Sequence, residues 1–304
     1  MALASWMALA DEPQPEEILI EVNGHGMHCL KTGKGPELVL LHGLLGSADA
    51  WYPCLSRLGQ DSTVYAVDSL GIGRSERVAG LDASLPAQAD RVANFLTGAG
   101  VDCADIVGTS HGGAVAMMLA ARHPERVRSL VLHAPANPFS LLGDPLVHFY
   151  GTPLGRWFAN QVPNLPEKLQ ELALGRMYGN NKVVRHEALE RYMSSLRVPG
   201  TVKHVMNIID CWFEDMRQLG AVLDRLSEVP TLLVWGTHDR AVSLESGRQL
   251  EKMLNRAELV ILPGVGHLPH DEAPIAFADV VNHFLRKINR GAPHAGPQLV
   301  RLNA

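Results

Sequence analysis

The chain has 304 residues, of which 46% are hydrophobic and 19% charged, and its formal net charge is −5 at pH 7. This composition is typical of a globular protein that can bury a large core, and without a basic block it gives nucleic-acid binding little support. The four cysteines form no Cys-x-x-Cys pair and no metal-like Cys/His spacing, so we expect reduced thiols and no metal site.

The first residues are apolar but lack basic neighbours, and the stretch is far too short to span a bilayer. We interpret 1–16 and 291–304 as tails of a soluble, cytoplasmic protein without stable membrane insertion, with a weak signal peptide as the alternative. The oligomeric state stays open, and a homodimer is one option.

Short β-branched runs alternate with helical patterns along the chain. The first two, before Gly35, are joined by Asn-Gly-His-Gly and predict an antiparallel hairpin at one sheet edge. Most of the later runs are continuously apolar, as in strands buried on both faces. These runs span 37–43, 62–68, 104–110, 128–134, 230–236 and 257–263. Helical patterns at 84–100 and 274–288 complete the prediction of an α/β fold with a mostly parallel, doubly wound sheet.

Between about 137 and 228 the strand signal disappears, and helical patterns rich in aromatic residues and methionine take over. An insertion between two strands must leave the sheet at an edge. We therefore expect an α/β core made of 17–136 and 229–290, with a helical cap over 137–228 above the carboxyl edge. The alternative is that these helices only extend the core.

Ser110 stands between glycines where an apolar strand meets a helical pattern, in the stretch DIVGTSHGGAVAMM at 105–118. This is the strand–turn–helix context of a nucleophile elbow, in which small neighbours let strand and helix approach closely. A serine hydroxyl there faces the crevice at the carboxyl end of the sheet, beside a helix N-terminus that favours developing negative charge.

A serine needs a base, and the base needs an orienting acid. His267 follows the last strand run on a glycine-rich loop. We prefer it to His270, because Gly266 gives the loop freedom and His270 begins a helix. Asp239 follows the preceding strand run, so the chain order is serine, acid, histidine.

The segment HGLLG at 42–46 follows a strand and predicts an oxyanion site made by the backbone N–H groups of Leu44 and His111. We interpret His42 as a hydrogen-bonding brace of this loop rather than a catalytic group. The segment DSLGIGRS at 68–75 lacks the full dinucleotide pattern and predicts a structural turn, not a cofactor site.

These motifs, in this order and each after a strand, resemble the α/β-hydrolase family over residues 17–290, in its capped serine-hydrolase branch. The resemblance implies Ser110 as nucleophile, His267 as base, Asp239 as orienting acid, and no metal or organic cofactor. Epoxide hydrolases and haloalkane dehalogenases carry aspartate at the position of Ser110. Carbon–carbon hydrolases of the meta-cleavage type have a pattern like GNS at the elbow and a tryptophan after the histidine. This chain has Thr109 and Leu268 at those two positions. Proline iminopeptidases usually show tryptophan where this chain has His111. A carboxylesterase-like enzyme acting on a small-molecule substrate fits best.

We expect Phe139, Trp157, Trp212 and Leu268 to contact an apolar substrate. The alternative is that most of the aromatic residues pack the cap helices together. Arg185, Arg191 and Arg197 form either a carboxylate site or a solvated helix face.

The leading hypothesis is ester hydrolysis, and nothing in the residues separates it from thioester or lactone hydrolysis. Carbon–carbon bond hydrolysis of a vinylogous diketone is a second hypothesis. A third is a non-catalytic ligand-binding protein on the same fold.

Overall fold

The computed structural model describes residues 14–140, 144–179, 184 and 186–289. Apart from residues 14–16, the predicted N-terminal tail lies outside this part, as does the C-terminal one. Within the described part, no helix is both long and apolar enough to cross a membrane.

Eight strands form one sheet in the order β1-β2-β4-β3-β5-β6-β7-β8. The edge pair β1–β2 is antiparallel, β2 is antiparallel to β4, and every later pairing is parallel. The predicted edge hairpin and the mostly parallel sheet are therefore confirmed. The strands are β1 (Glu16–Val22), β2 (His25–Thr32), β3 (Glu37–Leu41), β4 (Thr63–Val67), β5 (Ala104–Thr109), β6 (Val127–His133), β7 (Thr231–Gly236) and β8 (Ala257–Leu262).

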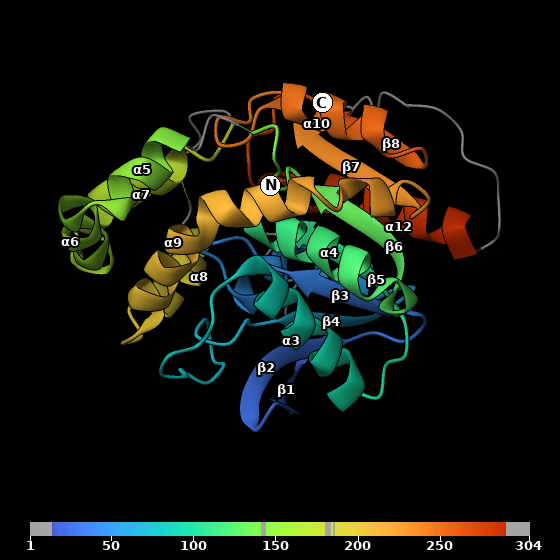
Figure 1. Ribbon diagram of the computed structural model, residues 1–304, viewed down its shortest axis with the longest axis horizontal. Helices are drawn as coiled ribbons and strands as arrows, with labels where there is room; N and C mark the ends of the chain where they lie inside the picture. Colours follow the sequence, from blue (N-terminus) through green and yellow to red (C-terminus); the bar gives the residue numbers. More distant parts are fainter. Residues whose placement is uncertain (1–13, 141–143, 180–183, 185, 290–304) are drawn as a thin grey trace, which may run out of the picture.

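Helices cover both faces of the sheet because its central strands are apolar on both sides. One apolar cluster joins the sheet to α3, α4 and α10, and another joins the opposite face to α2 and α12. Figure 1 shows α3 and α4 in front of the sheet and α12 behind it. The core helices are η1 (Ala48–Trp51), α2 (Tyr52–Leu58), α3 (Leu85–Gly98), α4 (His111–Arg122), η2 (Pro124–Arg126), α10 (Leu244–Met253), α11 (Pro269–Glu272) and α12 (Pro274–Asn289).

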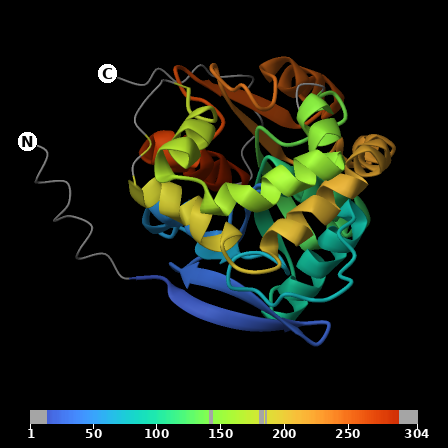
Figure 2. The ribbon, with the colours of Figure 1, turned by 90° about the vertical axis from the view of Figure 1, so that its left-hand side faces the viewer.

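The segment between β6 and β7 has helices and, among its described residues, no strand; we call it the helical insert. Its elements are α5 (Asp144–Gly151), α6 (Pro153–Gln161), η3 (Val162–Asn164), α7 (Glu167–Gly175), α8 (His186–Leu196), α9 (Thr201–Gly220) and η4 (Leu223–Leu226). Figure 2 looks at one end of the molecule, where these green to gold helices lie in front of the rest.

The insert contacts loops that follow parallel strands. In the loop after β8, His267 N donates to the carbonyl oxygen of Met177 over 2.7 Å, and Met177 lies just after the end of α7. Beyond β4, Gly71 lies so close to the ring of His204 on α9 that an added Cβ would be 2.7 Å from it. The insert therefore sits at the carboxyl edge of the sheet, where α/β proteins place their sites.

Candidate active site

Ser110 occupies the turn between β5 and α4 with φ 51° and ψ −120°. A positive φ is uncommon for a residue with a Cβ and persists only where surrounding contacts hold it. Here Ser110 N donates to His133 O on β6 over 3.0 Å, and Ser110 O accepts from Ala136 N over 2.9 Å. The backbone at Ser110 is thus fixed from the neighbouring strand.

Two glycines make this elbow possible by close approach. A Cβ at Gly108 would lie 2.4 Å from Gly112 O, and a Cβ at Gly112 would lie 2.4 Å from the carbonyl oxygens of Leu41 and His42. Strand β5, helix α4 and the loop after β3 could not all come together if either position carried a side chain.

Asp239 and His267 come from the loops after β7 and β8 and share a hydrogen bond, His267 Nδ1 to Asp239 Oδ2, of 2.8 Å. The Asp239 side chain is fully buried, and that of His267 is 7% exposed. The other oxygen, Asp239 Oδ1, accepts from Ala241 N and Val242 N over 2.8 and 2.9 Å. A buried carboxylate with these partners fixes the orientation and tautomer of the imidazole.

His133 connects this pair to Ser110. Its carbonyl holds Ser110 N, and its ring centroid lies 5.8 Å from that of His267. Ser110 and His267 therefore lie on either side of His133, in loops at the carboxyl edge of the sheet.

The neighbouring imidazoles are buried and uncharged. Burial holds the pKa of His133 well below its usual range, and it lowers the pKa of His270 to about 4. His270 lies in the short helix α11 against Trp51, with ring centroids 4.8 Å apart, and shares a hydrogen bond with Tyr192. Its place in a packed layer beneath the loop fits a structural role.

The loop after β3 lies against Ser110, since a Cβ at Gly43 would be 3.4 Å from Ser110 Cβ. A bond from Gly46 N to Gly43 O closes the turn that contains Leu44. Within the described residues, the backbone N–H groups of Leu44 and His111 have no hydrogen-bond acceptor. Two unpaired donors beside a serine can bind a developing oxyanion.

His42 braces this loop, as the sequence predicts. Its Nδ1 bonds Gly43 O over 2.8 Å, and its Nε2 accepts from Ser69 N over 3.2 Å. Burial lowers its pKa, which keeps the ring neutral and able to accept at Nε2.

The predicted substrate contacts are scattered. Trp212 on α9 stacks over His111 with ring centroids 6.2 Å apart, and Phe139 packs partly buried against the main core. Leu268 is buried in a cluster with α7 and α8, whereas Trp157 on α6 is 62% exposed. Of the four, Trp212 is the one whose ring touches a predicted site residue.

Two details differ from the sequence-based reasoning. Gly266 does not have a positive φ; it is required because a Cβ there would lie 2.4 Å from Gly179 N. Arg191 is no solvated side chain, since it is 17% exposed and pairs with the buried Asp271. Arg197 pairs with Glu190, and Arg185 lies outside the described residues.

The motif around Asp68 predicts only a structural turn. The structure shows that this residue also has partners far away in the sequence. Its fully buried carboxylate accepts from Ala48 N, at the end of the loop after β3 that carries Leu44. The signal was a single aspartate after a strand, which does not reveal such distant partners. No cluster of three or more metal-ligating side chains occurs in the described part of the chain.

The buried acid–histidine pair and the serine elbow, both at the carboxyl edge of a mostly parallel sheet, are a candidate active site. Residues 36–274 match the family model for the alpha/beta hydrolase fold. The chain belongs to the α/β-hydrolase fold family.

Two relatives are 31% identical to the chain. The 2-hydroxymuconate semialdehyde hydrolase of Pseudomonas putida aligns over 274 residues, which cover 86% of this chain and 91% of the relative. The pimeloyl-[acyl-carrier protein] methyl ester esterase of Nitrosomonas europaea aligns over 255 residues, or 83% and 96%. Among solved structures, a membrane phospholipase A from a bacterium is 28% identical, with a TM-score of 0.75 over 95% of this chain and 92% of that one.

Proposed function

We propose that the protein is a serine hydrolase that cleaves carboxylic esters of small or medium apolar substrates through an acyl-serine intermediate. The observation that carries this proposal is the buried Asp239–His267 hydrogen bond at the same edge of the sheet as the elbow serine Ser110. The unpaired N–H groups of Leu44 and His111 beside that serine support it. A relative named as a methyl ester esterase adds support from comparison.

In the proposed mechanism, Ser110 Oγ attacks the ester carbonyl while His267 Nε2 takes its proton. Asp239 stabilises the imidazolium that forms, and the N–H groups of Leu44 and His111 hold the oxyanion. His267 then gives the proton to the departing alcohol. Water activated by the same imidazole releases the acid from Ser110.

The helical insert serves as the cap over this site. Trp212 stacks on His111, and we assign it as the side chain that contacts the acyl chain beside the oxyanion donors. The surroundings support an uncharged substrate in part, because one of the partly buried guanidinium groups next to the insert is paired with a carboxylate. Arg77 donates to backbone carbonyls and to Thr201, and Arg191 pairs with Asp271. The four cysteines, all free thiols, fit a reducing compartment such as the cytoplasm.

The test is hydrolysis of p-nitrophenyl esters, from acetate to palmitate, by the wild type and by Ser110→Ala. Loss of the nucleophile is expected to lower kcat by about 10⁶-fold. Alanine has a Cβ like serine, so the variant should fold like the wild type. The matched control is Ser194→Ala, an exposed serine on α8, which should keep wild-type rates. Full activity in Ser110→Ala would refute the assignment.

Carbon–carbon bond hydrolysis is the second candidate, because relatives at 27% and 31% identity are named as a dienoate hydrolase and a semialdehyde hydrolase. A dienoate carries a carboxylate, which requires a cationic partner. The ion pair of Arg191 with Asp271 favours the ester, whereas Arg77 donates to uncharged oxygens and keeps its charge. Turnover of a vinylogous diketone acid without turnover of any simple ester would reverse this ranking.

A further inference from the structure

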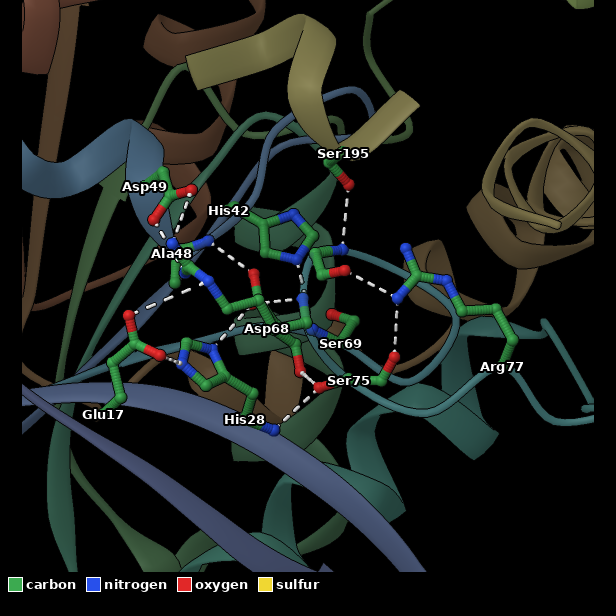
Figure 3. A network of polar contacts seen from close by, with 12 residues as sticks. Glu17, His28, His42, Ala48, Asp49, Asp68, Ser69, Ser75, Arg77 and Ser195 are labelled. Atoms are coloured by element: carbon green, nitrogen blue, oxygen red, sulfur yellow. Dashed lines mark hydrogen bonds and ion pairs between the residues drawn. The ribbon is translucent and has the colours of Figure 1, made fainter. Parts of the chain in front are cut away.

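Two consecutive residues after β4 hold both ends of the loop that carries Leu44. Ser69 N donates to His42 Nε2 at the start of the loop, over 3.2 Å. Asp68 Oδ1 accepts from Ala48 N at its end, over 2.7 Å. Figure 3 shows both contacts, with Asp68 at the centre of the network.

The carboxylate of Asp68 is fully buried, yet it accepts hydrogen bonds from three donors, one of which is Ala48 N. Its Oδ2 accepts from His28 Nδ1 over 2.8 Å and from Arg74 N over 2.9 Å. Burial alone raises the pKa of this carboxyl, but His28 and the backbone donors outweigh burial and leave the pKa below its ordinary value. Asp68 therefore stays ionised, and a charged acceptor makes stronger hydrogen bonds than a neutral one.

The helical insert is fastened to the same turn. Gly73 N donates to Ser195 Oγ on α8 over 2.8 Å. Arg77 donates to Gly73 O and, from its other terminal nitrogen, to Thr201 Oγ1 on α9 over 2.7 Å. Gly73 itself lies against Asp68, because a Cβ there would be 2.1 Å from that carboxylate. A continuous chain of contacts thus runs from α8 through Gly73 and Asp68 to the loop that carries Leu44.

We propose that Asp68 is a positioning residue that orients the Leu44 N–H toward the oxyanion, and that Ser195 couples the helical insert to the position of this N–H. The inference rests on the proposed function, because it assigns the N–H of Leu44 to the oxyanion. A purely structural carboxylate would affect stability alone. Asp68 affects the transition state, since the loop it holds supplies a donor that acts only when charge develops on oxygen.

The experiment compares Asp68→Asn, Ser195→Ala and the double variant in full-length protein, with p-nitrophenyl butyrate as substrate. Asp68→Asn is expected to lower kcat by about ten- to a hundredfold with little change in KM, less than the roughly 10²- to 10³-fold cost of deleting an oxyanion donor. Ser195→Ala leaves the Gly73 N–H without its acceptor and should lower kcat by about fivefold. The double variant should lose less than the product of the two effects, and Ser195→Thr should restore the rate.

The matched controls are Asp105→Asn and Ser194→Ala. Asp105 is also a buried carboxylate, held by Arg128 and Ser129 near the start of β5, so its loss should reduce stability but leave kcat unchanged. Equal kcat values in Asp68→Asn and Asp105→Asn would overturn the positioning role. Strictly multiplicative effects in the double variant would overturn the coupling. If Asp68→Asn does not fold, Ser195→Ala still tests the proposal by removing a single hydroxyl.

Labelling of Ser110 by a fluorophosphonate separates this inference from the proposed function. A wild type that is labelled but hydrolyses no ester would mean a different substrate, and the labelling rates of the same variants would then replace kcat. A wild type that is neither labelled nor active would overturn the proposed function and this inference together.

Discussion

Asp239 shows how much one buried carboxylate controls at the residue scale. One oxygen is held by the N–H groups of Ala241 and Val242, so the other is aimed at His267 Nδ1 without freedom to turn. Replacing it by an amide would keep the shape but offer His267 a donor where it needs an acceptor.

We predict that Asp239→Asn lowers kcat for ester hydrolysis by about 10⁴-fold while the protein stays folded, because the imidazole is left in the wrong tautomer. Steady-state kinetics and circular dichroism measure the two effects. Asp279→Asn, which removes an exposed carboxylate paired with Arg57, is the control and should keep its activity. A loss below tenfold in Asp239→Asn would contradict the role given to the pair.

The placement of Ser110, Asp239 and His267 in loops at one edge of the sheet could be predicted from sequence, because each follows a strand within a short motif and parallel strands end at one edge. Trp157 shows the limit of the same reasoning. Its aromatic character suggested a substrate contact, but α6 presents it to solvent, and no local pattern states which face of an insert helix is covered. The ion pair of Arg191 could not be predicted either, because its partner Asp271 is 80 residues away in the sequence.

At the scale of elements, α9 caps α3 from outside. Ser84 precedes α3 but makes no side-chain cap, and Leu85 N donates instead to Asp215 Oδ1 on α9 over 2.9 Å. Asp215 is 3% exposed, and burial raises its pKa to about 6. We therefore expect the contact that joins insert and core to depend on pH.

The sign follows from proton linkage. The pKa of the Asp215 carboxyl is 3.8 in the unfolded chain and about 6 in the folded protein. Between these two pH values the folded state binds more protons than the unfolded state. The free energy of unfolding therefore falls as the pH rises through this range. We predict that Asp215→Asn gains about 1 to 3 kcal/mol over the wild type between pH 4 and pH 6.5. Urea unfolding across that range measures it. A stability difference that does not change with pH would contradict the prediction, and Asp224→Asn, at an exposed site, should show no such trend.

At the scale of the whole molecule, the strand order explains the site. β5 lies between β3 and β6, so the serine elbow, the loop that carries Leu44 and His133 become neighbours although His42 and His133 are 91 positions apart in the sequence. Alternation of strands and helices predicts this sheet. The order of strands and the long-range network around Asp68 are not encoded in local periodicity, because they depend on packing between distant segments.

We propose that Ser110 carries the acyl group during turnover. The most direct measurement is acid quenching of the protein during hydrolysis of p-nitrophenyl butyrate, followed by mass spectrometry of its peptides. We predict a butyryl group on the peptide that contains Ser110 and on no other, with Ser110→Ala carrying none. Turnover without an acylated Ser110 peptide, or with the acyl group on another residue, would contradict the account.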